Sequence, residues 1–171
     1  GLHVPVVAVN ISATHFCSAG LPRQIVGLLD EYGLAPQRLT IEITEGVMMR
    51  QNAETMATIA AIRAIGVGLS LDDFGTGFSS LSRLADLPLT EIKIDRSFVA
   101  NFEEDVGAFV VTEAAINIGK RLGITVVTEG VETAIQNEKL LNMGCDVVQG
   151  YLFGKPVPPA EFYDWYKMFF S

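Results

Sequence analysis

Two adjacent carboxylates, Asp72 and Asp73, follow an apolar segment and lead directly into the sequence Phe-Gly-Thr-Gly. The two carboxylates repel each other unless water or a cation balances their charge. The pair therefore fits either a helix N-cap doublet or a cation site. Gly75 and Gly77 allow a sharp bend or a close backbone approach to a ligand in the loop that follows. The pair alone does not decide between the two interpretations, and polar residues elsewhere in the chain have to be considered with it.

Oxygen-donating side chains recur at the ends of other apolar segments. The full set is Asn10, Glu42, Asp72, Asp73 and Glu129. Because the set holds no histidine or cysteine, it suits Mg²⁺ or Mn²⁺, or Ca²⁺, better than zinc. Two such ions, bridged by a carboxylate, would support in-line displacement at phosphorus, with Lys93 giving positive charge to water or phosphate. Glu129 or Glu132 could bind metal or accept a proton, although single residues of the set also fit helix caps or a Glu42–Lys93 salt bridge.

A repeating strand–helix pattern carries these residues. The expected strands are 4–10, 38–44, 67–72, 91–95, 124–129 and 146–149. Helices are expected to start near Leu21, Asn52, Ser79 or Ser80, Asp105, Thr133 and Pro158–Pro159. Four of them are expected to end at a glycine, namely Gly33, Gly66, Gly123 and Gly144. This alternation predicts a parallel sheet.

An open doubly wound sheet and a (β/α)8 barrel both fit that alternation. An open sheet gathers its ligand groups mainly at one switch point, whereas a barrel collects them from many strand ends. Here each expected strand has a polar residue at or near its carboxyl end, including Gln149 on the last one. Ser70 and Asp72 also share one face of their strand, opposite Leu69 and Leu71. A polar inner face predicts an α/β fold of the TIM-type barrel class, with about six βα units in this chain.

The chain has 171 residues, whereas a barrel of this class typically has about 250. We therefore expect residues 1–171 to be the C-terminal two-thirds of a single barrel domain, with two βα units before residue 1. A net charge of −8 argues against binding to a nucleic-acid polymer or direct contact with an anionic membrane. Cys17 and Cys145 lie outside any CxxC pair, which indicates free thiols and a cytoplasmic protein.

Six segments together resemble the EAL domain, a family of bacterial cyclic di-GMP phosphodiesterases. They are Asn-Ile-Ser at 10–12, Glu-Ile-Thr-Glu at 42–45, Asp-Asp-Phe-Gly-Thr-Gly at 72–77, Lys-Ile-Asp-Arg-Ser-Phe-Val at 93–99, Glu-Gly-Val-Glu-Thr at 129–133 and Gln-Gly-Tyr at 149–151. The resemblance covers essentially the whole chain in the right order. It implies hydrolysis of cyclic di-GMP to linear pGpG with Mg²⁺ or Mn²⁺, while Ca²⁺ is expected to bind and inhibit.

The resemblance also implies residue roles. The implied metal ligands are Asn10, Glu42, Asp72, Asp73 and Glu129, of which Asp73 serves a second ion and Glu129 is a candidate general base. Lys93 would contact the catalytic water, and Glu132 and Gln149 would complete the catalytic site. Glu45 would anchor the loop from residue 73 to residue 79. Asp95 would lie where members of the family build a dimer interface, so a homodimer is expected.

The chain departs from the family pattern at several points. Phe78 stands where tyrosine is common, Gly46 where serine is common, and Thr128 where alanine is common. The Glu-Ala-Leu signature and the arginine after it are absent, so residues 1–171 alone are expected to be nearly inactive. Two alternatives stay open: a receptor that holds cyclic di-GMP without cutting it, and an enolase-like Mg²⁺ enzyme in which Lys93 abstracts a proton.

Overall fold

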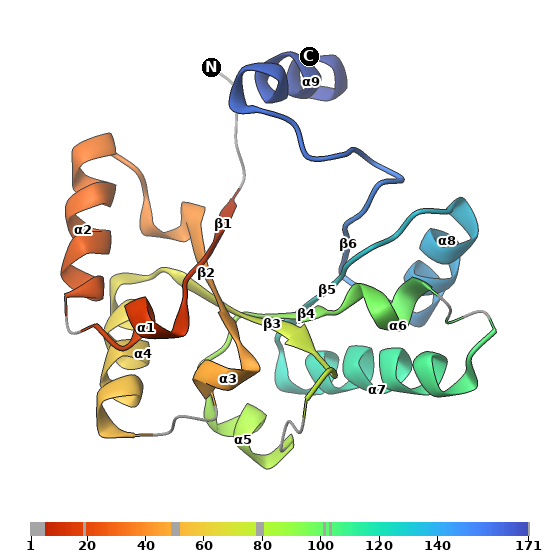
Figure 1. Ribbon diagram of the computed structural model, residues 1–171, viewed down its shortest axis with the longest axis horizontal. Coiled ribbons are helices and arrows are strands. Elements are labelled where there is room, and N and C mark those ends of the chain that lie inside the picture. Colours follow the sequence, from red (N-terminus) through yellow and green to blue (C-terminus); the bar gives the residue numbers. More distant parts are fainter. Residues whose placement is uncertain are drawn as a thin grey trace.

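Six short parallel strands form one curled sheet in the computed structural model (Figure 1). They are β1 (Val7–Asn10), β2 (Leu39–Thr44), β3 (Gly68–Phe74), β4 (Glu91–Ile94), β5 (Thr125–Thr128) and β6 (Val147–Val148). The structure describes residues 6–18, 20–48, 52–77, 81–100, 102 and 104–170.

The strands lie side by side in sequence order, and each neighbouring pair is parallel. A doubly wound sheet reverses its strand order at a switch point, whereas a barrel adds each new strand beside the previous one. The sequential order therefore confirms the barrel-type fold predicted from the strand ends. Within the described ranges β1 and β6 each pair on one side only, so the sheet is an open part of a barrel.

Helices connect the strands. They are α1 (Ala13–Phe16), α2 (Leu21–Tyr32), the 3-10 turn η1 (Pro36–Arg38), α3 (Glu45–Met48), α4 (Ala53–Ile65), α5 (Leu81–Asp86), α6 (Arg96–Ala100), α7 (Val106–Leu122), α8 (Ala134–Met143) and α9 (Pro159–Phe170). The predicted N-caps at Asn52, Asp105 and Thr133 are confirmed, because each side chain accepts a backbone N–H of the first helical turn. The four predicted glycine ends are also confirmed, each with a positive φ.

Some boundaries differ from the prediction. Strand β3 was expected to stop at Asp72 but continues through Asp73 to Phe74. The other site-bearing strands are shorter than expected, so Asp95 and Glu129 come directly after β4 and β5. Three short helices, α1, α3 and α6, were not foreseen, because a helix of four or five residues carries no clear periodicity. The expected cap at Ser79 or Ser80 and the start of the first strand lie outside the described residues.

The two faces of the sheet carry different side chains, as the alternation predicted. One face is apolar and fully buried, and it includes Ile41, Ile43, Leu69, Leu71, Ile92 and Ile94. Helices α4 and α7 pack against strands of this sheet. The other face bears Glu42, Ser70 and Lys93, which are polar but also buried. This buried polar face leads toward the carboxyl ends of the strands, where the predicted site residues lie.

Both cysteines are free thiols, as the sequence indicated, and Cys145 is buried. Across the described parts of the chain, every helix is too short or too polar to traverse a lipid bilayer.

Candidate active site

The ammonium group of Lys93, on β4, is the centre of a cluster of acids. Lys93 Nζ lies 2.7 Å from Glu42 Oε1 and 2.5 Å from Glu129 Oε1. Asp72 Oδ1 lies further away, at 3.7 Å. These acids come from β2, from β3 and from the residue that follows β5, so the curl of the sheet brings four segments to one point. The sequence prediction that these strand ends form a single site is consistent with this arrangement.

A β-bulge places both aspartates at this point. Leu71 pairs with Ile92 and Phe74 pairs with Ile94, so Asp72 and Asp73 together stand opposite Lys93. Asp73 has a φ of 57°, in the left-handed region that a non-glycine residue seldom adopts. A bulge of this kind turns a side chain that regular alternation would direct away from the site. The bulge therefore brings Asp73 beside Asp72 and opposite Lys93 along the strand, and the charges of both residues act on the Asp73 carboxylate.

The acids outnumber the positive charge. Burial raises the pKa of Asp73, and the negative charges of Asp72 and Asp95 raise it further, while Lys93 lowers it. Burial likewise raises the pKa of Glu129, and hydrogen bonding to Lys93 opposes that effect. Burial alone would lower the pKa of Lys93, but its hydrogen bonds to carboxylates raise it overall. One permanently charged ammonium thus faces several carboxylates, and further positive charge would stabilise the cluster.

A divalent cation fits this donor set by its chemistry. Carboxylate oxygens are the preferred ligands of Mg²⁺ and Mn²⁺, and the acids of the cluster carry excess negative charge. In the described part of the chain, however, no three His, Cys, Asp or Glu side chains are arranged as a metal-ligating group. Glu42, Asp72 and Glu129 are directed at Lys93 Nζ. The assignment of metal ligands therefore stays a prediction.

Three other predicted residues lie at the same end of the sheet. Asn10 ends β1 and stands in register with Glu42 on β2, and its side chain is exposed. Glu132 and Gln149 are exposed and follow β5 and β6. A backbone hydrogen bond holds Gln149 there, since its N–H donates to the carbonyl of Thr128. Their catalytic roles stay predictions.

Glu45 lies at the start of α3, one residue after β2 ends. The backbone N–H of Gly77 donates to the Glu45 carboxylate, and a Cβ atom at Gly77 would clash with Glu45 Oε2. Burial raises the pKa of Glu45, although this N–H group lowers it. The Oε1 atom is buried without a hydrogen-bond partner among the described residues. Glu45 thus contacts the loop after β3, as an anchor would.

Gln136, a buried residue on α8, has a role that was not predicted from the sequence. Its Oε1 atom accepts the backbone N–H groups of Glu132 at 2.8 Å and Thr133 at 3.0 Å. Its Nε2 atom donates to the carbonyl of Val99 on α6 at 3.3 Å. Gln136 therefore fixes the loop after β5, which carries Glu129. The signal was available as a capping box, because a threonine N-cap followed three residues later by glutamine has this geometry.

Comparison with known sequences gives a consistent result. A sequence model of the EAL domain matches residues 2–156. The oxygen sensor protein DosP of Escherichia coli is 48% identical over 164 residues, which are 96% of this chain and 20% of DosP. The bifunctional diguanylate cyclase/cyclic di-GMP phosphodiesterase MucR of Pseudomonas aeruginosa is 41% identical over 155 residues, 91% of this chain and 23% of MucR. The chain thus spans about a fifth of the length of these relatives.

Solved structures are similar as well. The MucR phosphodiesterase of Pseudomonas aeruginosa in complex with c-di-GMP has a TM-score of 0.87 at 39% identity. That match covers 92% of this chain and 64% of the MucR chain. BlrP1 of Klebsiella pneumoniae, solved with c-di-GMP and either calcium or manganese, has a TM-score of 0.82 at 30% identity. Its match covers 88% of this chain and 39% of the BlrP1 chain.

Proposed function

Because this chain belongs to the EAL domain family, we propose that its acid cluster takes part in hydrolysis of cyclic di-GMP to linear pGpG. The observation that carries the proposal is the convergence of carboxylates from three segments on the buried ammonium of Lys93. A site that is both cationic and strongly acidic suits a phosphodiester whose own charge must be balanced during attack by water. The related MucR structure holds c-di-GMP, which supports the same substrate here.

The residues of the cluster would have different roles in this reaction. Glu42, Asp72, Asp73 and Glu129, with Asn10, would hold Mg²⁺ or Mn²⁺, and the bound ion would supply Lewis acidity toward the phosphate. Lys93 stays protonated, because its carboxylate partners raise its pKa, and it can donate to water or to a phosphate oxygen. The calcium and manganese complexes of BlrP1 support a divalent cation without deciding which one this chain uses.

The reaction is balanced by one water molecule. The water oxygen attaches to phosphorus, the bond from phosphorus to the 3′ oxygen of one ribose breaks, and that oxygen receives a proton. In this proposal Glu129 accepts the proton of the attacking water, and the rise of its pKa by burial supports the role. Glu132 and Gln149, which are exposed at the same end of the sheet, would complete the catalytic site.

The native polypeptide that carries residues 1–171 provides the test. It is incubated with cyclic di-GMP and Mg²⁺ or Mn²⁺, and pGpG is separated by chromatography, with a chelator as the control. Metal-dependent formation of pGpG supports the proposal. Tight binding of cyclic di-GMP without any pGpG would instead show a receptor, and turnover of acid sugars alone would show an enolase-like enzyme.

We also propose that residues 1–171 form the C-terminal two-thirds of a single barrel domain. Strands β1 and β6 have no partner on their outer sides among the described residues. The match covers 64% of the MucR phosphodiesterase chain, so that chain has further residues outside the match. Residues of this kind could form the missing units. Two βα units between β1 and β6 would complete the eight strands of such a barrel.

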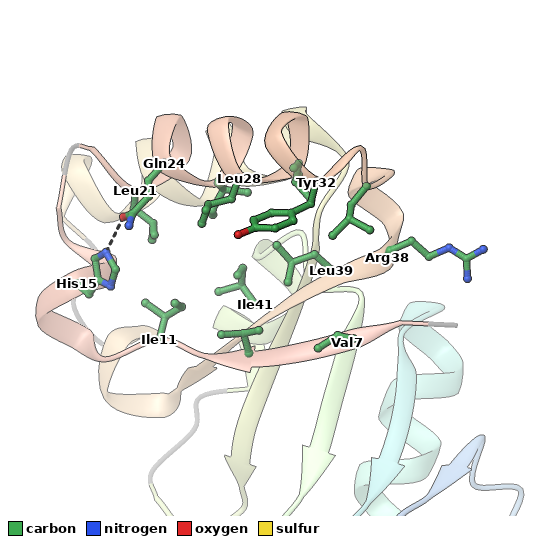
Figure 2. A pocket seen from close by; sticks show the side chains of 14 residues that line it. Val7, Ile11, His15, Leu21, Gln24, Leu28, Tyr32, Arg38, Leu39 and Ile41 are labelled. Carbon is green, nitrogen blue, oxygen red and sulfur yellow. Dashed lines mark hydrogen bonds between the residues drawn. The ribbon is translucent and has the colours of Figure 1, made fainter. Parts of the chain in front are cut away.

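An apolar hollow beside β1 supports this proposal. It has a volume of about 710 Å³ and lies between α2 and the strands β1 and β2. Figure 2 shows Leu28, Tyr32 and Leu39 lining it, while His15 and Gln24 hydrogen bond at its rim. Its lining is mostly aliphatic, so the occupant that fits is the apolar face of a preceding βα unit.

The expected homodimer and the cytoplasmic location are proposals as well. Asp95 caps α6, and its Oδ1 atom accepts the backbone N–H of Ser97 at 3.0 Å and the Ser97 hydroxyl at 2.5 Å. Burial would raise the pKa of Asp95, but these hydrogen bonds lower it overall. A partner subunit that contacted this position would therefore contact a charged carboxylate, whose orientation the hydrogen bonds from Ser97 already fix. The free thiols of Cys17 and Cys145 support a reducing compartment.

A further inference from the structure

The short helix α6 lies against both loops that carry the acids of the site. A Cβ atom added to Gly75, in the loop after β3, would lie 2.8 Å from Cε2 of the Phe98 ring. A Cβ atom added to Gly130, in the loop after β5, would overlap the side chain of Arg96. Both glycines also have positive φ, so each loop bends where it passes α6. Direct backbone contact of this kind makes α6 a common support for the two loops.

Packing against the rest of the protein fixes the position of the Phe98 ring. It is partly buried and packs against the hydrophobic core, while its neighbour Val99 is fully buried. Asp95 caps the first turn of α6 through Ser97, and Gln136 donates to the carbonyl of Val99. Because α6 is fixed at both ends, the ring cannot move away from Gly75 without disturbing these contacts.

In its described part, residues 73–77, the loop that contacts the ring has local hydrogen bonds. Thr76 donates to the Asp73 carbonyl through its backbone N–H at 3.2 Å and its hydroxyl at 2.9 Å. Asp73 N–H donates to Asp72 Oδ1 at 3.1 Å. A non-glycine residue at positive φ, such as Asp73, persists only when its surroundings determine the conformation. The surroundings that do so are Glu45 on one side, through Gly77, and the Phe98 ring on the other.

We propose that Phe98 is a positioning residue: its ring, packed against Gly75, holds the bulge in which Asp72 and Asp73 both lie opposite Lys93. The ring touches no reacting atom. The ring prevents an alternative conformation in which β3 continues with regular alternation and the Asp73 side chain points away from the cluster. The effect on metal binding rests on the proposed phosphodiesterase site, whereas the effect on loop conformation does not.

The test compares Phe98→Ala, Phe98→Leu and a control, Phe102→Leu, in the native polypeptide that carries residues 1–171. Phe102 is also buried, but it stacks on Phe109 of α7. Hydrogen–deuterium exchange of the peptide that spans residues 72–77 reports the loop, and electron paramagnetic resonance of free Mn²⁺ reports metal binding. Loss of a residue that orients metal ligands typically weakens metal binding by roughly 10- to 100-fold.

We expect Phe98→Ala to speed exchange in residues 72–77 and to weaken Mn²⁺ binding by at least about 10-fold. Phe98→Leu should change the exchange rate and Mn²⁺ binding less than Phe98→Ala does. Phe102→Leu should change neither quantity. Unchanged exchange and unchanged Mn²⁺ binding in Phe98→Ala would overturn the proposal, as would equal effects of Phe98→Leu and Phe102→Leu. If the unmodified protein bound no Mn²⁺ and cut no cyclic di-GMP, the proposed function would fail, and the exchange measurement would still decide the role of Phe98.

Discussion

Lys93 Nζ lies 2.7 Å from Glu42 Oε1, and both side chains are more than nine-tenths buried. Removing such charges from water is costly, and close pairing with good geometry offsets that cost only when both partners are present. Glu129, at 2.5 Å from the same ammonium, depends on it too. The lysine is therefore a structural counter-ion of the cluster as well as a candidate catalytic group.

Replacing Lys93 by methionine should destabilise the metal-free protein by about 3 kcal/mol, because buried carboxylates lose their partner. Added Mn²⁺ should recover part of this loss if the acids hold a cation. Urea unfolding with chelator and with Mn²⁺ measures both effects. Lys155→Met, which changes a lysine packed over Tyr151, is the matched control. Unaltered stability of Lys93→Met in chelator would contradict the counter-ion role.

Asp72→Asn should lower the rate of cyclic di-GMP hydrolysis by at least about 100-fold, since it removes a charge aimed at the centre of the site. The amide is nearly isosteric, so folding should be retained, and circular dichroism checks this point. Asp30→Asn on α2, an exposed position, is the control and should keep the full rate. Full turnover of Asp72→Asn, or full activity of the unmodified protein in chelator, would refute a metal-dependent reaction.

Glu45→Ala should weaken Mn²⁺ binding by about 10-fold or more without unfolding the domain, because the loop at Gly77 loses its carboxylate contact. Isothermal titration with Mn²⁺ gives the affinity, and thermal unfolding gives the stability. Glu31→Ala, at an exposed position near the end of α2, controls for loss of one negative charge. Normal Mn²⁺ affinity in Glu45→Ala would show that other contacts hold the loop.

Much of the fold could be predicted because local chemistry decides it. Asn52, Asp105 and Thr133 cap their helices in the structure as their side chains require. The barrel class followed from polar residues at successive strand ends, among them Glu42 on β2, since parallel strands end at one edge.

The geometry inside the site could not be predicted in the same way. Strict alternation places neighbouring residues on opposite faces, so it gave no reason for Asp72 and Asp73 to oppose Lys93 together. The bulge depends on contacts far along the chain, from Phe98 and from Glu45. Contacts of this kind produce no periodic pattern in the sequence. Among the residues described above that fix the site loops, only Gln136 had a local signal, the capping box.

Cys145 should make stability depend on alkaline pH. Burial raises its pKa, although a hydrogen bond with Thr128 opposes the rise. The folded state therefore favours the neutral thiol, and this contribution is complete below the unfolded pKa of about 8.5 and is lost as pH rises through the folded pKa. From about pH 8 to about pH 10, the free energy of unfolding of the unmodified protein should fall relative to that of Cys145→Ala.

Urea titrations at the two pH values measure this difference. Cys17→Ala, which removes the other thiol, is the control and should follow the unmodified protein. A constant difference between the unmodified protein and Cys145→Ala across the range would show that burial of this thiol does not affect stability through its ionisation.

Residues 1–171, expressed alone, should self-associate and hydrolyse cyclic di-GMP only marginally. Val7 and Val9 on β1 are 52% and 39% exposed, and β1 and β6 leave backbone groups unpaired on their outer sides in the described structure. Open edges of this kind pair with other chains. Without the two missing units the barrel is not closed, so turnover should be low even though Lys93 and Glu42 are buried.

The charged variant Val7→Lys should reduce self-association, because a lysine at a strand edge opposes pairing. Val106→Lys, at an exposed position on α7, is the control and should not. Light scattering after gel filtration gives the mass, for which a monomer is 18.5 kDa. Fusing roughly 80 residues that supply two βα units, the shortfall from a typical barrel, should restore turnover. A monomer of residues 1–171 that cuts cyclic di-GMP at an ordinary enzymatic rate would overturn the claim that the barrel must be completed.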